Sequence, residues 1–548
     1  MLLRRAPRRA GPCVTAAFAA VLAALAAAAA TGAATADAPP LELFLAASSR
    51  DAAAQLVDSV VKSGPGFDAA YRALQRGRRY GAAQTGVVRL RNKTSDGVEH
   101  HYVLNVPETY DAARRYQVRF QLHGGVGGRP SNAPVGTGTI GALAGAEQIY
   151  VIPYAWNDAP WWSDDQVLNL VEILDATKRT YNIDENRVVV SGVSDGGTGA
   201  YWVAMRETTP FASFLPLNGY WMVLASGDID DGMVFANNLR NKPIFAVNGG
   251  RDRLYPTAVV DPYIAHMKRG GVSVDYHPQP EAGHNTAWWP EVKDTFEAFV
   301  REHPRVPLPD TLTWETGRTN RAGGSGEAGR AGQSSQTGNR AHWLIIDALG
   351  AQPGDASLTD LNDMAMPPAP DFGVRTVGSR VNQVMPGSNA EKIGVKPGDG
   401  IVRFDDKPIP SGLDLADVLE DVAPGSAITL LVARNNEPVE LSGTYDPQLA
   451  PVPPRHLFAR GGPSGRVDLT RTGNTVTAAT RGVAAFTLLL SPAQFDFAKP
   501  VTVVVNGRTA FEGKVEKNIR TLLKYAAVDN DRTMLFGAEV HVDLARRR

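Results

Sequence analysis

The chain has 548 residues, of which 43% are hydrophobic and 21% charged, and its formal net charge is -1. This length predicts several domains, and the composition is that of folded globular protein rather than of a disordered chain. Without net positive charge or a strong basic stripe beyond the N-terminus, the sequence argues against nucleic acid as a general partner.

Residues 1–36 have the pattern of an export signal. An alanine-rich apolar stretch covers 14–30, and Ala-Thr-Ala at 34–36 offers a cleavage site. The stretch could instead be a membrane anchor, but its shortness favours cleavage, leaving a secreted or periplasmic protein without a membrane span. The route, Sec or Tat, stays open. The single cysteine, Cys13, would leave with the signal, which excludes disulfides and thiolate sites in the mature chain. The arginines that precede the apolar stretch are Arg4, Arg5, Arg8 and Arg9.

Apolar residues at helical spacing predict an N-terminal helical segment at 37–86. From 87 to 304, extended and helical patterns alternate, which predicts a mostly parallel, doubly wound α/β sheet with helices on both faces. The extended segments are 87–90, 101–106, 116–122, 148–153, 187–190, 214–217, 243–247 and 272–276, and the helical ones are 166–181, 200–206 and 289–303.

Short extended segments return after residue 304, on both sides of a compact unit at 368–446. The first part, 305–367, includes a flexible loop rich in glycine and serine at 322–336, and the second part is 447–548. Three unrelated β pieces would be an alternative. Too few strands precede the compact unit to bury a sheet of their own, so we expect one β-sandwich-like lobe with an inserted domain.

The pattern Gly-x-Ser-x-Gly centred on Ser194 follows the extended segment 187–190 directly. In a tight strand-to-helix turn, the residues beside the serine cannot carry large side chains, and Gly192 and Gly196 meet that demand. Such a turn exposes the hydroxyl of Ser194 above the sheet. The five-residue pattern alone arises by chance, but a strand before it and a helix after it are the context that supports a nucleophile.

A glycine-rich loop, His123 to Gly128, follows another extended segment. Backbone N–H groups in such a loop can stabilise the negative charge that develops on a carbonyl oxygen, and losing one donor costs about 3–4 kcal/mol. The N–H of Gly125 or Val126 is one candidate donor, and that of Asp195, after the serine, is the other. A phosphate-binding loop is the alternative, but no lysine follows at the required spacing.

An acid and a histidine complete the pattern at the ends of later strands. Asp252 follows the segment 243–247 in Asn-Gly-Gly-Arg-Asp, and His284 follows the last strand in Glu-Ala-Gly-His-Asn. Asp261 is the runner-up for the acid, at an expected helix start. The order Ser, Asp, His is that of one hydrolase fold and differs from the order in two unrelated protease folds.

With these four motifs, residues 87–303 resemble secreted α/β-hydrolases of the esterase and polyhydroxybutyrate-depolymerase-like kind. The resemblance implies that Ser194 attacks an acyl carbon, His284 acts as base and then acid, and Asp252 orients the histidine. Asp195 departs from the apolar, aromatic or amide residue that is more usual after the serine. This departure changes the expected polarity of the pocket.

Most of the nine tryptophans lie in loops that follow strands of the expected sheet. Ligands of open α/β sheets bind at that edge, so these rings could form an aromatic cleft for a sugar, a phenolic acid or a polyester. Core packing is the alternative and fits Trp202 and Trp289. The residues expected to contact substrate are His123, Gly124, Trp156, Trp162, Tyr220, Trp221 and Trp288.

The compact unit contains the pattern Pro-Gly-Ser-x-Ala, then Gly-Val-x-x-Gly-Asp, across 386–399. It resembles a PDZ domain of the bacterial protease-associated type. The resemblance implies that a peptide adds a strand to the sheet edge, with its C-terminal carboxylate in the loop Phe372-Gly373-Val374. Leu415 and Leu419 would line the groove from a helix.

The sequence predicts no metal and no cofactor. The acidic stretches 228–232 and 529–531 do not fit the EF-hand spacing, and no His-Glu-x-x-His is present. We therefore expect an exported serine hydrolase of carboxylic esters whose PDZ domain binds a peptide or partner. The alternatives are a prolyl-oligopeptidase-like serine peptidase, although the preceding region is too short for that family's propeller, and a non-catalytic PDZ-based binding protein.

Overall fold

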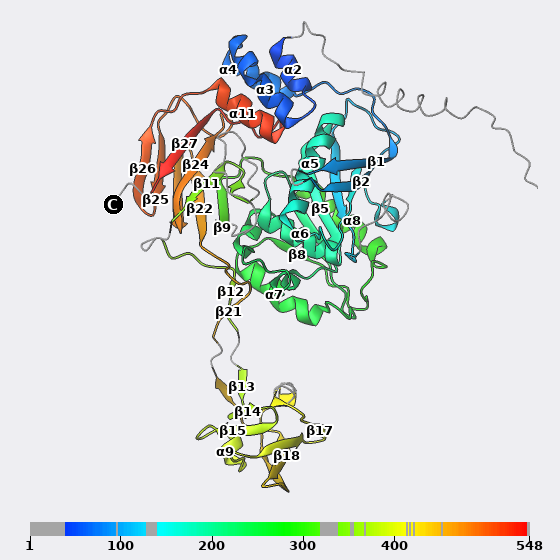
Figure 1. Ribbon diagram of the computed structural model, residues 1–548, viewed down its shortest axis with the longest axis vertical. Helices are drawn as coiled ribbons and strands as arrows, with labels where there is room; N and C mark the ends of the chain where they lie inside the picture. Colours follow the sequence, from blue (N-terminus) through cyan, green and yellow to red (C-terminus); the bar gives the residue numbers. More distant parts are fainter. Residues whose placement is uncertain are drawn as a thin grey trace, which may run out of the picture. The chain divides into compact units, whose positions relative to one another are not determined.

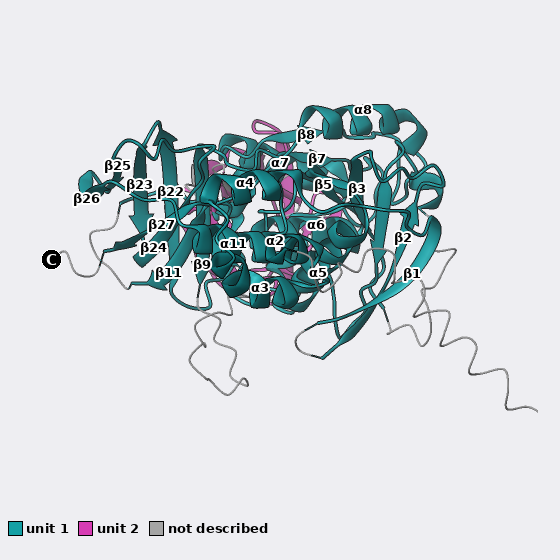
Figure 2. Cartoon of the chain, turned by 90° about the horizontal axis from the view of Figure 1, so that it is seen from above, with its two compact units in different colours: residues 1–362, 458–548 teal, residues 363–457 magenta. Residues whose placement is uncertain are grey.

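The computed structural model describes residues 39–94, 97–127, 140–317, 338–350, 356–366, 369–412, 415, 418–419, 422–450 and 453–544. The predicted signal at 1–36, Gly128 and the predicted flexible loop at 322–336 lie outside the described residues. The chain forms two compact units, one of residues 363–457 and the other of the remaining chain on both sides of it (Figure 2). Within the described residues, no helix is both long enough and apolar enough to cross a membrane.

The N-terminal segment forms three helices, α2 (Pro40–Ala46), α3 (Arg50–Lys62) and α4 (Phe67–Arg76). Helix α3 begins where the Ser49 hydroxyl accepts the Ala52 N–H at 3.1 Å, which satisfies one of the free N–H groups of the first turn. The three helices lie beside α11 (Ile519–Asp529) from the far end of the chain (Figure 1). The sequence patterns had not indicated α11. The buried side chains of this cluster include Phe44, Val60, Leu74, Leu522 and Leu523.

An eight-stranded sheet forms the centre of the larger unit, in the order β1-β2-β4-β3-β5-β6-β7-β8. Only β2 runs antiparallel to its neighbours, so the predicted mostly parallel α/β-hydrolase sheet is confirmed. Strand β5, near the centre of the sheet, is rich in valine, as expected for a strand buried on both faces. The strands are β1 (Gly86–Lys93), β2 (Glu99–Val106), β3 (Tyr116–Leu122), β4 (Ile149–Pro153), β5 (Ile183–Val193), β6 (Ser213–Leu217), β7 (Ile244–Ala246) and β8 (Val274–Tyr276).

Helices α5 (Asp164–Thr180), α6 (Asp195–Arg206), α7 (Thr257–Arg269) and α8 (Trp289–Glu302) connect or follow these strands. Helix α5 has aspartates in its first turn and basic residues in its last, which complements the helix dipole. Helix α8 packs Phe296 and Phe299 against Phe245 of β7, with ring centroids 5.5 and 5.3 Å apart. Three short 3-10 helices, η1 (Gly141–Leu143), η2 (Trp221–Ala225) and η3 (Ala236–Asn241), lie in the connections.

The segments on both sides of the smaller unit combine into one β lobe, as predicted. One sheet has the order β10-β11-β24-β27 and the other β26-β25-β23-β22-β9, and a single apolar core lies between them. The sequence pattern predicts an extended segment over Met534–Val542, but the last strand of the lobe begins at Ala538. The strands are β9 (Thr311–Gly317), β10 (Arg340–Ala341), β11 (Leu344–Leu349), β22 (Ser464–Thr472), β23 (Thr475–Arg481), β24 (Val483–Leu490), β25 (Val501–Val505), β26 (Arg508–Gly513) and β27 (Ala538–Asp543).

Buried ion pairs join the β lobe to the central sheet. The Arg305 guanidinium lies 2.6 Å from the Asp531 carboxylate, whose other cationic neighbour is Lys178 at 3.7 Å. All three side chains are almost inaccessible to water. Arg532, the next residue, pairs with Glu185 of β5. Because buried charges need partners, separating the lobe from the sheet would leave these charges unpaired.

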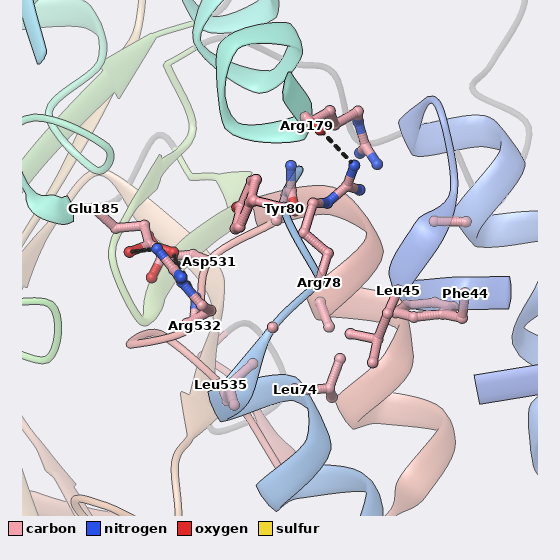
Figure 3. A pocket seen from close by; sticks show the side chains of 14 residues that line it. Phe44, Leu45, Leu74, Arg78, Tyr80, Arg179, Glu185, Asp531, Arg532 and Leu535 are labelled. Carbon is pink, nitrogen blue, oxygen red and sulfur yellow. Dashed lines mark hydrogen bonds and ion pairs between the residues drawn. The ribbon is translucent and has the colours of Figure 1, made fainter. Parts of the chain in front are cut away.

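A small cavity lies among the N-terminal helices, α11 and β5, and Figure 3 shows the side chains that line it. Arg78 donates to the carbonyl oxygens of Arg179 and Ala47 at 2.9 Å each, and Arg179 donates to Ala47 at 2.7 Å. The arginines thus fasten the first helices to α5. None of the lining residues belongs to the predicted catalytic set.

The smaller unit has the predicted PDZ fold, with a five-stranded sheet in the order β14-β15-β16-β18-β19. Strand β14 is at the edge of that sheet, and β17 pairs with β16. Two short pairs, β12 with β21 and β13 with β20, join the chain entering and leaving the unit. The elements are β12 (Asp363–Met364), β13 (Ala369–Asp371), β14 (Val374–Val377), β15 (Arg380–Val384), α9 (Asn389–Lys392), β16 (Gly400–Phe404), β17 (Lys407–Pro408), β18 (Ala427–Arg434), β19 (Glu437–Thr444), β20 (Gln448–Ala450) and β21 (Arg455–His456).

Candidate active site

The turn between β5 and α6 places Ser194 in a strained conformation. Its φ of 57° and ψ of -118° are rare for a residue with a side chain, and strain of this kind is stored at functional sites. A Cβ atom on Gly192 would lie 2.0 Å from the Gly196 carbonyl oxygen, and one on Gly196 would lie 2.3 Å from the Leu122 carbonyl oxygen. Only glycine therefore fits at positions 192 and 196, two residues before and two residues after Ser194.

Ser194, His284 and Asp252 form a chain of two hydrogen bonds. His284 Nε2 lies 2.8 Å from Ser194 Oγ, and His284 Nδ1 lies 2.7 Å from Asp252 Oδ2. The Asp252 side chain is fully buried, so its carboxylate favours a proton on Nδ1 and leaves Nε2 to accept from the serine hydroxyl. Asp261, the runner-up, lies inside α7 and accepts a hydrogen bond from the Tyr276 hydroxyl instead.

The loops that carry the acid and the histidine are packed against each other. The Arg251 N–H donates to the Ala282 carbonyl at 2.9 Å, and a Cβ atom on Gly249 would lie 2.3 Å from the same oxygen. The Asn218 side chain, at the end of β6, donates to the Asn285 carbonyl at 2.8 Å. Hydrogen bonds to the backbone on both sides of His284 thus hold the loop that carries its ring.

The glycine-rich loop after β3 lies directly over the serine. A Cβ atom on Gly124 would lie 2.9 Å from the Ser194 Cβ, so any side chain there would crowd the hydroxyl. Gly125 has a φ of 67° and faces open space. The N–H of Val126 donates to Asp195 Oδ2 at 2.8 Å and is therefore engaged. Among the described residues, the N–H groups of Gly125 and Asp195 have no hydrogen-bond acceptor.

His123 faces inward rather than toward the serine. Its Nδ1–H donates to the Gly124 carbonyl at 3.0 Å, and its Nε2 accepts the Ala155 N–H at 3.1 Å. Burial lowers the pKa of His123, against the opposing influence of the Gly124 carbonyl and the Asp195 charge. The Trp161 indole also donates to the His123 carbonyl at 2.8 Å. His123 thus anchors the loop, and the expected contact with substrate has no support at this residue.

Three of the four tryptophans expected to contact substrate are buried. Trp156, Trp221 and Trp288 are each at most 4% exposed. The Trp156 ring packs 5.2 Å from His100, and Trp221 packs edge-on to Phe458 at 5.6 Å. Core packing, the alternative reading, describes these three rings, and only Trp162 is half-buried. Their position in loops after strands could not reveal that the rings turn into the core.

Tyrosines take the place of the tryptophans beside the catalytic histidine candidate. The Tyr255 ring lies 5.6 Å from the His284 ring, and Tyr220 lies 5.8 Å from Tyr255. Burial raises the pKa of Tyr255, as do the nearby charges of Asp195 and Asp252, so its phenol stays neutral. Leu254 beside it is 60% exposed. Sequence reasoning missed Tyr255, although it follows the predicted acid by only three residues.

The residues expected to bind a peptide in the PDZ unit divide into two groups. Phe372, Leu415 and Leu419 are buried in the core of the unit. Val374 is half-buried and is the first residue of the edge strand β14. Gly373 has a φ of 89°, and a Cβ atom there would lie 2.0 Å from the Ser388 Cβ. Its N–H donates to Asp371 Oδ1 at 2.8 Å. The peptide groove stays a prediction.

The described residues contain no group of three or more histidine, cysteine, aspartate or glutamate side chains that could hold a metal ion.

Parts of this chain are similar to known proteins. A family model for the PDZ domain matches residues 380–434. Over 69 residues, the chain is 38% identical to the periplasmic pH-dependent serine endoprotease DegQ of Escherichia coli (strain K12), covering 13% of this chain and 15% of that one. Over 156 residues it is 26% identical to the probable feruloyl esterase C of Aspergillus terreus (strain NIH 2624 / FGSC A1156), covering 27% of this chain and 57% of that one.

A solved structure of a ferulic acid esterase aligns with 40% of this chain and 99% of its own length, at 18% identity and a TM-score of 0.32. The chain thus spans 15% and 57% of the lengths of the two curated relatives. The strand order, rather than this alignment, carries the fold assignment. The chain combines an esterase-like α/β-hydrolase unit with a PDZ domain.

Proposed function

We propose that this protein is an exported serine hydrolase that cleaves carboxylic esters through Ser194, His284 and Asp252. The observation that carries the proposal is the hydrogen-bonded chain from Asp252 through His284 to Ser194, with distances of 2.7 and 2.8 Å. The strained turn at Ser194 and the glycine loop above it support the same conclusion. Export rests on the signal pattern of residues 1–36.

In the proposed reaction, His284 Nε2 accepts the hydroxyl proton as Ser194 Oγ attacks the ester carbon. The tetrahedral intermediate has a negative oxygen, which the N–H groups of Gly125 and Asp195 would stabilise. His284 then returns the proton to the leaving alcohol, and an acyl-enzyme remains on Ser194. Water activated by the same nitrogen releases the acid and restores the serine.

The surroundings of the site favour an ester with a flat or apolar group. Tyr220 and Tyr255 present aromatic surface near His284, and Leu254 adds an exposed apolar side chain. An ester of a phenolic acid fits this surface through ring packing. A polyester segment is the other acyl class that an apolar surface of this kind accepts.

A peptidase is the second candidate, because the PDZ unit offers a way to hold a peptide. In the PDZ unit, β14 is an edge strand of its sheet, to which an extended segment could add. The same serine and histidine could cleave an amide once a peptide is held. The PDZ unit would then recruit the substrate, whereas in an esterase it would bind a partner.

The test compares ester and amide hydrolysis by the full-length mature protein. We expect wild type to hydrolyse p-nitrophenyl butyrate and methyl ferulate, and Ser194→Ala to lose activity by about 10⁴-fold or more. Cleavage of peptide p-nitroanilides without ester cleavage would replace the esterase by the peptidase. A folded wild type inert toward both classes would leave the non-catalytic PDZ-based binding protein as the remaining reading.

A further inference from the structure

The residue after the serine is an aspartate whose side chain reaches the glycine-rich loop. Asp195 Oδ2 accepts the N–H of Val126 at 2.8 Å, across 69 positions of the sequence. This bond joins the loop after β3 to the first turn of α6. The carboxylate is well placed for charge as well, because it lies at the positive end of the helix dipole.

Hydrogen bonds hold the glycine-rich loop at both of its ends. At the first end, His123 is held by the Ala155 N–H and by the Trp161 indole. At the second end, Val126 is held by Asp195. Gly125 lies between these fixed points, with a positive φ and open space on the side where a Cβ would project. The direction of the Gly125 N–H therefore depends on both attachments.

The charge of Asp195 by itself opposes ester hydrolysis. A carboxylate next to the serine raises the energy of any negative charge that develops on the substrate oxygen. An asparagine would offer the same acceptor oxygen without that charge. The benefit of Asp195 must therefore come from the position of its acceptor oxygen and its fit to the helix N-terminus.

We propose that the Asp195 carboxylate is a positioning residue that latches the loop 123–127 onto α6. By engaging the Val126 N–H, it leaves the N–H groups of Gly125 and of Asp195 itself as the pair that faces the substrate oxygen. The catalytic consequence rests on the proposed function. The latch is a property of the folded chain and can be measured without turnover.

The experiment uses the full-length mature protein with Asp195→Ala, which removes the acceptor, and Asp195→Asn, which keeps an acceptor oxygen. Asp51→Ala is the matched control, because it removes a first-turn carboxylate from another helix, α3. The readouts are kcat and KM for p-nitrophenyl butyrate, and amide hydrogen exchange of peptides that cover 123–127.

We expect Asp195→Ala to lower kcat by about 10- to 100-fold with KM within about threefold, because the loss is one of donor placement in the transition state. Exchange at 123–127 should become faster. Asp195→Asn should recover kcat to within about fivefold of wild type and restore the protection. The Asp51→Ala control should match wild type in both readouts.

Two results would overturn the latch. One is unchanged exchange at 123–127 in Asp195→Ala, and the other is an Asp195→Asn variant as slow as Asp195→Ala, which would assign the effect to charge. Should wild type show no esterase activity, the proposed function fails by itself, and hydrogen exchange still decides the latch. An Asp195→Ala chain that does not fold leaves Asp195→Asn to decide, by its kcat and its exchange.

Discussion

At the scale of single residues, the buried carboxylate of Asp252 makes three hydrogen bonds with distinct purposes. Oδ2 faces His284 Nδ1, while Oδ1 accepts the N–H groups of Leu254 and Tyr255 at 2.8 and 3.0 Å. The two hydrogen bonds that Oδ1 accepts shape the loop that places Tyr255 beside the histidine. One side chain therefore sets both the tautomer of His284 and the wall of the site.

Asp252→Asn separates these two roles. Its amide oxygen can keep the bonds to the loop, but its N–H₂ group then faces His284 Nδ1 and favours the tautomer that cannot accept from Ser194. We expect kcat to fall by about 10³–10⁴-fold, with the urea unfolding midpoint nearly unchanged. Steady-state kinetics with Asp261→Asn, the rejected acid, as control should show no comparable loss. A variant Asp252→Asn that keeps a tenth of the activity would contradict this role.

The sequence predicted the residues of the site whose function depends on where a strand ends. Ser194, Asp252 and His284 each follow a strand of a parallel sheet, and such positions meet at one edge. Side-chain direction is different, because it depends on packing between distant segments. Trp156 and Trp221 turn into the core, and the carboxylate of Asp195 reaches back to Val126. The order of residues along the chain predicts neither of these side-chain directions.

At the scale of elements, α6 lies unusually close to the strands beneath it. A Cβ atom on Gly197 would lie 2.9 Å from the Gly219 Cα and 3.0 Å from the Leu217 carbonyl oxygen. The Gly199 position is as tight, with Trp161 Cβ 2.5 Å away. This close approach puts the first turn of α6 directly under the glycine-rich loop.

Gly197→Ala tests the close approach. Alanine should gain about 1 kcal/mol from its helix propensity, but the backbone contacts must shift, which costs about 1–3 kcal/mol or more. We expect a net loss of unfolding free energy in urea titrations, together with a lower kcat as Ser194 moves. Gly81→Ala has open space around its Cβ and should leave both unchanged. A Gly197→Ala protein more stable than wild type would exclude the tight packing.

The elements that sequence patterns missed are those stabilised by distant partners. Helix α11 is short and stands between β strands, and its apolar side chains Leu522 and Leu523 pack on helices from the first 76 residues. The predicted β strand at Met534 failed for a related reason. Residues 534–536 are buried without strand pairing, so their apolar character reflects core contact rather than a sheet.

At the scale of the whole molecule, a buried ion cluster makes the central sheet and the β lobe one body. Burial acts to raise the pKa of Asp531, but Arg305, Lys178 and hydrogen bonds from Thr533 outweigh it and hold that pKa well below its usual value. A lowered pKa in the folded state stabilises the fold above the unfolded value of about 4. This contribution disappears as the pH falls through the folded value.

Asp531→Asn leaves Arg305 and Lys178 buried without their carboxylate. At pH 7 we expect a loss of about 3–5 kcal/mol of unfolding free energy, and the gap to wild type should narrow as the pH drops below about 4. Urea unfolding of both proteins at a series of pH values measures the loss at pH 7 and how the difference in unfolding free energy changes with pH. Asp310→Asn, an exposed carboxylate paired with Arg471 in the same lobe, should cost under about 1 kcal/mol. A gap that stays constant from pH 7 to pH 3 would contradict the charge-based account.

Every step of the proposed reaction requires that Ser194 is a nucleophile activated by His284. The most direct measurement of this reactivity is labelling of the full-length mature protein with a fluorophosphonate probe, followed by mass spectrometry of the digested peptides. We expect one adduct, on Ser194, that is absent from Ser194→Ala and forms much more slowly in His284→Ala. Labelling of Ser194→Ala at the wild-type rate, or a wild-type adduct on another residue alone, would contradict it.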